Sequence, residues 1–136
     1  MRQVGRLSLG VAAVAISTLA LAAPAMAAGP SAKVTPNKGL ANAQTVKVTF
    51  SGFAKGSTVI VVQCQKPIKS VSDATKYCNL KEVKQIKTAT GAGSTSYVVN
   101  TGKIGTAGMC VSKGSCVIAV ATQKPAAGVF PKITFK

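Results

Sequence analysis

The sequence contains no histidine and no tryptophan, and Asp73 and Glu82 are its only carboxylate side chains. General acid–base catalysis near neutral pH normally uses His, Asp or Glu, and hydrolysis by paired carboxylates needs the two groups a few ångströms apart. The two carboxylates stand apart among lysines, and a nucleophilic Ser or Cys would lack its base. These absences exclude most enzyme mechanisms and favour a binding function.

The absence of histidine also bears on the four cysteines, which occur as Cys64 with Cys78 and Cys110 with Cys116. Neither spacing is that of a zinc knuckle, and no histidine could complete one, so disulfides are favoured over a metal site. Four thiols in an oxidising compartment allow three connectivities. Local pairing is the simplest interpretation, because each pair brackets a loop beside an apolar strand. Closing a loop of about 15 residues removes unfolded-state entropy worth roughly 3 kcal/mol.

Arginine is missing after residue 6, and Arg2 and Arg6 form a short cationic start to the chain. An apolar run over about residues 7–23 follows, and then Ala25-Met26-Ala27, the small-x-small pattern that signal peptidase accepts. The alternative is a membrane-spanning helix, for which a run of roughly 17 residues is at the lower limit. We expect residues 1–27 to be a cleaved signal peptide and the product to be secreted, with no remaining membrane span.

Negative charge is scarce in what remains after residue 27, where fifteen lysines face two carboxylates and give a net charge of +13. Such a charge attracts anionic partners and makes encounter rates salt-dependent. Arginine is the usual reader of base edges, so lysine without arginine indicates weak affinity for DNA or other polyanions without sequence preference. The alternative is a solvated surface that keeps a secreted monomer soluble.

Helical periodicity is absent as well, because no window of eleven or more residues after the signal has an apolar stripe at helical spacing. Residues 45–50 alternate instead, with Val46, Val48 and Phe50 on one face. Residues 58–64 and 116–121 are nearly all apolar, as expected of central strands with little solvent on either face. Further strands are expected at residues 33–35, 84–88, 95–100 and 132–136.

Turn signals separate these segments, among them Pro36-Asn37-Lys38-Gly39 and Gly91-Ala92-Gly93. About seven strands at a spacing of 8–12 residues are typical of a two-sheet sandwich. We therefore predict an all-β sandwich that forms one domain over residues 28–136. The stretch between Cys64 and Lys84 is the longest one expected to be irregular.

An ordered set of short motifs resembles the neocarzinostatin family of apoproteins. The motifs are AKVTPNKGL (32–40), VKV (46–48), GFAKGS (52–57), VQC (62–64), CN (78–79), GSTS (93–96), GT (105–106), CVI (116–118) and GVFPKITF (128–135). Each motif is weak alone, but together they cover nearly the whole mature chain in order, with both cysteine pairs in place.

The resemblance implies a seven-stranded immunoglobulin-like sandwich with a small hairpin arm and two local disulfides, Cys64–Cys78 and Cys110–Cys116. It also implies a secreted antibiotic apoprotein of an actinomycete. Such a protein holds a labile, hydrophobic enediyne chromophore non-covalently in a cleft between sandwich and arm. The freed chromophore binds DNA and cuts it by radical chemistry.

Carried onto this sequence, the family's cleft implies a floor formed by Gln63 and the bridge between Cys64 and Cys78. Residues 100–109 would form one wall. The implied lining residues are Val117, Ala119 and Ala121 on the neighbouring strand, with Ile104 and Met109 in the wall.

The wall segment lacks the aromatic side chains that stack on the chromophore in the family's namesake, and the chain is basic where familiar members are acidic. These differences leave an alternative function open. The chain would then be a secreted or cell-envelope module that binds anionic polymers without any chromophore.

Overall fold

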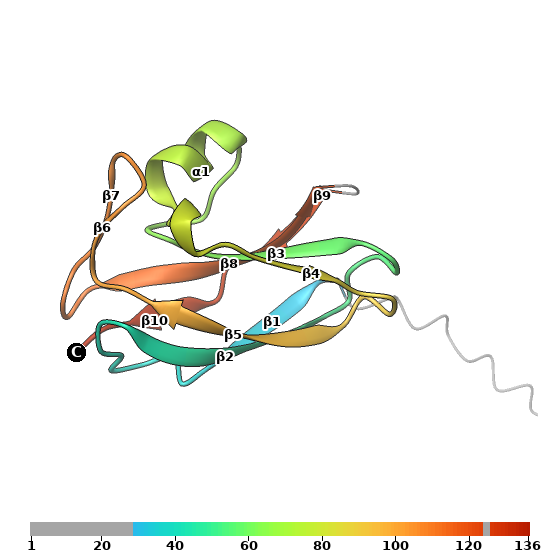
Figure 1. The fold of residues 1–136 in the computed structure, drawn as a ribbon, viewed down its shortest axis with the longest axis horizontal. Helices are drawn as coiled ribbons and strands as arrows, with labels where there is room; N and C mark the ends of the chain where they lie inside the picture. The colour runs from blue at the N-terminus through green and yellow to red at the C-terminus, as the bar shows by residue number, and fades with distance from the viewer. Residues whose placement is uncertain (1–28, 124–125) are drawn as a thin grey trace, which may run out of the picture.

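The computed structural model describes residues 29–123 and 126–136, so the predicted signal peptide over residues 1–27 lies outside the described residues. Two antiparallel sheets form stacked layers (Figure 1). The smaller sheet has the order β1-β2-β5, with β1 Ser31–Thr35, β2 Gln44–Ser51 and β5 Gly93–Val99. The larger has the order β10-β8-β3-β4, with β9 paired to β8, and comprises β10 Lys132–Thr134, β8 Ser115–Gln123, β3 Thr58–Cys64, β4 Lys84–Lys87 and β9 Ala126–Val129.

The alternation of side chains along β2 decides which of them face the core. Val46, Val48 and Phe50 are buried, while Lys47 between them is exposed, because successive residues of a strand point to opposite faces. In contrast, β3 and β8 are buried along most of their length on both faces, as predicted for central strands. The sandwich core lies between the sheets and includes Val59, Val61, Tyr97, Ile118, Val120 and Ile133.

All seven predicted strands are present, and the predicted all-β sandwich is confirmed. Three short strands were not predicted from periodicity: β9, and the pair β6 (Gly102–Ile104) and β7 (Gly108–Cys110). The strands β6 and β7 form a separate two-stranded hairpin, which corresponds to the small arm that the resemblance implied.

The stretch expected to be irregular contains a helix, α1 (Val71–Tyr77), and a 3₁₀ turn, η1 (Leu80–Glu82). Periodicity could not reveal α1, because the helix has seven residues and none of them is buried. The local signal is a side-chain cap at the N-terminus of the helix instead. The Ser70 hydroxyl accepts a hydrogen bond from the Asp73 N–H at 3.2 Å, and the Asp73 carboxylate accepts one from the Lys69 N–H at 3.1 Å.

Candidate functional site: an apolar cluster on the outer face of the larger sheet

The outer face of the larger sheet, turned away from the sandwich core, carries a second group of apolar side chains. Strand pairing places Val62 opposite Ala119 and Cys64 opposite Val117, and residues paired in this way lie side by side on one face. We call this group the outer cluster. It consists of the buried residues Val62, Cys64, Cys78, Val117 and Ala119, with Ile68, Ala74, Val83 and Phe130 partly buried against them.

A disulfide between Cys64 and Cys78 holds the covering segment onto this face. Hydrogen bonds at 2.8 Å on either side of the bridge, from the Gln65 N–H to the Tyr77 carbonyl and from the Asn79 N–H to the Gln63 carbonyl, add to it. Residues 65–83, which we call the crossover, therefore leave and rejoin the sheet at the same place. Figure 1 shows α1 on the side of the larger sheet that faces away from the smaller one.

The second disulfide joins Cys110 at the end of β7 to Cys116 in β8, and both residues belong to the sandwich core. The two local pairings are therefore the ones predicted. Because Cys110 ends the arm, this bridge fastens the arm to the larger sheet.

The arm supports α1. The N–H groups of Thr106 and Ala107 donate to the carbonyls of Thr75 and Lys76, at 3.2 and 2.8 Å. A Cβ atom at Gly105 would stand 2.5 Å from the Lys76 carbonyl oxygen, and Gly105 has a φ of +63°. Glycine is therefore needed for this close approach.

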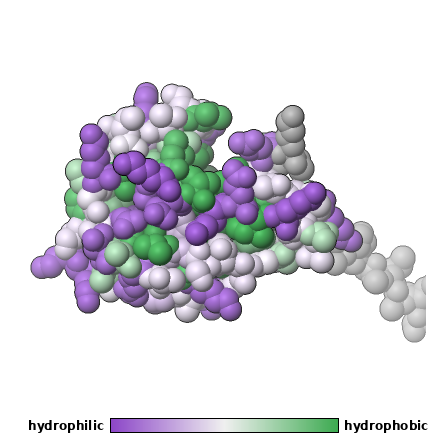
Figure 2. All heavy atoms as spheres, in the orientation of Figure 1, coloured by the Kyte–Doolittle hydropathy of each residue, from purple (hydrophilic) through white to green (hydrophobic). Residues whose placement is uncertain are grey.

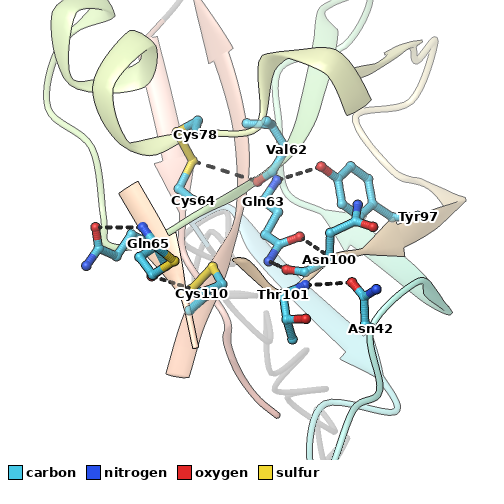
Figure 3. Close-up of a disulfide and its surroundings, with 12 residues drawn as sticks. Asn42, Val62, Gln63, Cys64, Gln65, Cys78, Tyr97, Asn100, Thr101 and Cys110 are labelled. Carbon is cyan, nitrogen blue, oxygen red and sulfur yellow. Dashed lines mark hydrogen bonds between the residues drawn. A yellow bond between two sulfur atoms is a disulfide. The ribbon is translucent and has the colours of Figure 1, made fainter. Parts of the chain in front are cut away.

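Gln63 lies on the opposite face of β3 from its neighbour Cys64. Its side-chain amide donates to the Asn100 carbonyl at 2.7 Å and accepts from the Asn100 N–H at 2.8 Å, while the Tyr97 hydroxyl accepts from the Gln63 N–H at 2.9 Å (Figure 3). Burial raises the pKa of Tyr97 to about 12, against the opposing effect of the Gln63 hydrogen bond; the negative charge of Glu82 adds to the rise. Gln63 thus joins β3 to the end of β5 on the inner side.

The structure brings together five of the residues that the resemblance implied. Cys64, Cys78, Val117 and Ala119 are in the outer cluster, and Ala121 is half-buried further along β8. Gln63 faces inward and Ile104 is part of the sandwich core, so neither belongs to the outer cluster. Met109 is 45 % exposed on β7, and its N–H donates to the side-chain oxygen of Gln65, the residue after Cys64, at 3.3 Å.

Phe130 is an aromatic residue of the site that the implied set did not include. Phe130 packs against the outer cluster, and a Cβ atom at Gly128 would stand 3.5 Å from its ring and 3.4 Å from the methyl group of Ala121. Both groups therefore border the space above Gly128. Phe130 lies within the motif GVFPKITF, but only the pairing of β9 with β8 indicates which face its ring covers.

The surface view agrees with an apolar zone on this side of the molecule. Figure 2 shows hydrophobic residues gathered between α1 and β4, below a notch that separates α1 from β9. Two surface hollows lie elsewhere, on the smaller sheet. One of about 550 Å³ is lined by residues including Thr45, Lys47 and Ser96, and one of about 300 Å³ by residues including Lys33 and Thr49. Threonine, serine and lysine residues line most of both hollows, and neither hollow includes a residue of the outer cluster, so we place the candidate site by its chemistry at the outer cluster.

Within residues 29–123 and 126–136, no three His, Cys, Asp or Glu side chains come together as a metal site requires. Over the same residues, no helix is long and apolar enough to cross a bilayer.

Fold and site together define a class: a small β-sandwich binding domain whose crossover is fixed by a disulfide over an apolar face. The model of the Neocarzinostatin family matches residues 32–134. The chain therefore belongs to the neocarzinostatin family, whose apoproteins are non-enzymatic, and the predicted resemblance is confirmed.

Individual relatives agree. The chain is 38% identical over 121 residues to the antitumor antibiotic C-1027 apoprotein of Streptomyces globisporus, covering 88% of this chain and 81% of that protein. It is 42% identical over 92 residues to actinoxanthin of Streptomyces globisporus, covering 66% of this chain and 61% of that protein. The structure of macromomycin matches with a TM-score of 0.61 and 27% identity, over 79% of this chain and 100% of that one.

Proposed function

We propose that this chain is the secreted protein part of an antibiotic complex and binds a hydrophobic, enediyne-type chromophore non-covalently at the outer cluster. Residues 1–27 would direct its export, and residues 28–136 would form the binding domain. The observation that carries the proposal is a second apolar cluster outside the sandwich core, on a face with small side chains at Ala119 and Ala121.

The residues present fit an apolar group. Binding pockets for small molecules are lined mainly by hydrophobic side chains with a few polar groups, and the outer cluster consists of aliphatic, cystine and aromatic surface. Phe130 offers one ring for stacking, a contact that residues 100–109 cannot supply. The chromophore would supply the DNA-damaging chemistry, while the chain's residues hold it and exclude water from one side of it.

The crossover is the element that would cover the ligand. Its ends are fixed by the Cys64–Cys78 bridge, and α1 is fixed by the arm. Ile68 and Val83, near its two ends, contact the outer cluster. A ligand would enter between these residues and Phe130, so the two sides of the site come from segments far apart in sequence.

A bulky residue at Ala121 tests the proposal directly. Ala121→Phe should lower the affinity for the neutral fluorescent probe pyrenebutanol about tenfold or more, which corresponds to ~1.4 kcal/mol. Ala119→Phe should do the same and also lower the melting temperature, because overpacking a buried position costs about 1–3 kcal/mol. The matched control is Ala92→Phe, at an exposed position on the loop before β5, which should leave binding unchanged.

Equal probe binding by the wild type, Ala121→Phe and Ala92→Phe would overturn the carrier proposal. Protein purified from its native source gives an independent test. Its absorbance spectrum and its intact mass under non-denaturing conditions should reveal a non-protein group that organic solvent extracts.

The outer face of the smaller sheet favours a second candidate function, the binding of anionic polymers. Lys33 is paired with Thr49, and Lys47 with Thr35 and Ser96, so ammonium and hydroxyl donors lie side by side there. Duplex DNA should bind weakly, and its affinity should fall steeply with salt because binding releases counterions. Replacing both lysines by Gln should reduce this salt slope; a marked preference for base sequence would contradict the lysine-based mechanism.

A further inference from the structure

A lysine stands directly beside the floor of the outer cluster. In the pairing of β10 with β8, Lys132 is the partner of Val117, and paired residues on one face have Cβ atoms about 4.5–5.5 Å apart. Lys132 is exposed, whereas Val117 is buried. The aliphatic stem of Lys132 can therefore lie along the edge of the cluster while its ammonium group stays in water.

Positive charge continues around the same face. On the crossover, Lys66 and Lys69 are exposed and flank Ile68, which contacts the cluster. The Lys66 ammonium lies 4.1 Å from the centre of the Tyr77 ring, an arrangement that holds its charge near the end of α1.

Negative charge that could balance these lysines is absent from the strands. The only carboxylate side chains of the chain are Asp73 in α1 and Glu82 in η1. Asp73 already accepts a hydrogen bond from the Lys69 N–H in the helix cap. A cationic ligand on this face would therefore meet several ammonium groups and two carboxylates at most, neither of them on a strand.

We infer that the ligand of the outer cluster is an amphiphile with an apolar body and an anionic group, such as a carboxylate or sulfate, held beside Lys132. This inference rests on the proposed carrier function and specifies the chemical class of its ligand. The apolar body lies between the crossover and Phe130, above the buried Val117 and Ala119, and the anionic group points past Phe130 toward solvent, where it need not be fully desolvated.

Three pyrene probes that share one apolar body test the charge preference. Anionic pyrenebutyrate should bind more tightly than neutral pyrenebutanol, and cationic pyrenebutylamine should bind most weakly. Lys132→Gln should reduce the affinity for pyrenebutyrate about fivefold, the upper range for a partly exposed ion pair, and leave that for pyrenebutanol unchanged. The reduction should shrink as salt is raised, because ions screen the pair.

The matched control is Lys55→Gln, which changes the net charge equally. Lys55 is exposed in the turn before β3, at the opposite end of that strand from Cys64, so salt screens its charge from the site. It should therefore leave the affinity for pyrenebutyrate unchanged.

Equal losses of pyrenebutyrate affinity in the Lys132 and Lys55 variants would show that overall charge alone sets the preference and would overturn the inference. If pyrenebutanol binds and is blocked by Ala121→Phe while pyrenebutyrate binds no better, the carrier function stands and the anionic ligand is wrong. Failure of every probe to respond to Ala121→Phe would instead overturn the carrier function itself.

Discussion

The two faces of the larger sheet use the same strands for different purposes. On the inner face, Val61 pairs with Val120, and both are fully buried against the smaller sheet. On the outer face, Val62 pairs with Ala119, and both are buried beneath the crossover and Phe130. The side chains are almost equally buried, but a whole sheet covers one face and a single disulfide-bound segment covers the other. Exposed area alone therefore does not separate a structural core from a candidate binding face; the element that covers each face does.

The largest difference should appear when one large side chain is removed from each face. Ile118→Ala on the inner face should cost about 2–5 kcal/mol of unfolding free energy, because it leaves a cavity between two sheets. Val117→Ala on the outer face should cost about 1 kcal/mol, since it removes fewer atoms and the crossover can settle onto the smaller residue. Urea unfolding with an unchanged m-value measures both; equal costs would show that both faces are core.

Removing each disulfide in turn gives a second comparison of the two faces. Replacing Cys64 and Cys78 together by Ala should cost about 3 kcal/mol, from a closed loop of about 15 residues, and should also weaken pyrenebutanol binding. Replacing Cys110 and Cys116 should cost about 2 kcal/mol, from a loop of about 7 residues, with a smaller effect on binding. Peptide mapping without reduction should find only these local pairs, and a crossed pair such as Cys64–Cys116 would contradict the structure.

High pH should lower the unfolding free energy of the protein through the ionisation of Tyr97, which lies on the inner face. Its pKa is about 12 in the folded protein and about 10 when unfolded. Below pH 10 both states keep the proton and the contribution of Tyr97 to stability is complete. From about pH 10 to 12 the unfolded state loses the proton first, so roughly 2–3 kcal/mol of stability should disappear. The lysines titrate in the same range, so the measured quantity is the difference in slope between wild type and Tyr97→Phe; equal slopes would show that Tyr97 is not responsible.

The smallest expected loss of stability comes from a change in α1, the helix of the crossover. Ser70→Ala removes the N-cap of α1 and should cost about 1 kcal/mol. The amides of α1 should exchange with deuterium faster, while those of β3 and β8 stay protected. The control is Ser72→Ala, at the exposed second residue of the same helix. It should change the unfolding free energy and the amide exchange little. Equal effects of the two substitutions would rule out the capping role.

Prediction from the sequence succeeded where the hydrophobic pattern along a segment is enough to identify a strand. Alternation in β2 and the apolar runs of β3 and β8 located the central strands. It failed for β6, β7 and β9, because strands of three or four residues that contain glycine show too little alternation to recognise. It also failed for α1, whose seven residues are held by a cap rather than by an apolar stripe.

The candidate site was predicted in part for the same reason. The cysteine pairs and the small residues Ala119 and Ala121 were apparent in the sequence. The sequence did not show on which face of β3 the Gln63 side chain lies. Because β3 is apolar on both faces, its residue pattern does not say which side chains face the smaller sheet. Ile104 was assigned to a wall by resemblance, whereas the tight hairpin of the arm turns it into the sandwich core.

The amino-acid sequence was enough to assign the class of protein: an all-β fold with local disulfides, a strongly basic surface, a composition that favours binding over catalysis, and resemblance to a family. These properties follow from composition, from a period of two residues and from short motifs, all of which are local. Only the folded chain brings Phe130, Ile68 and Val83 against the outer cluster and places Lys132 beside Val117. Those contacts join residues far apart along the chain, and they depend on strand register and on where the crossover returns to the sheet.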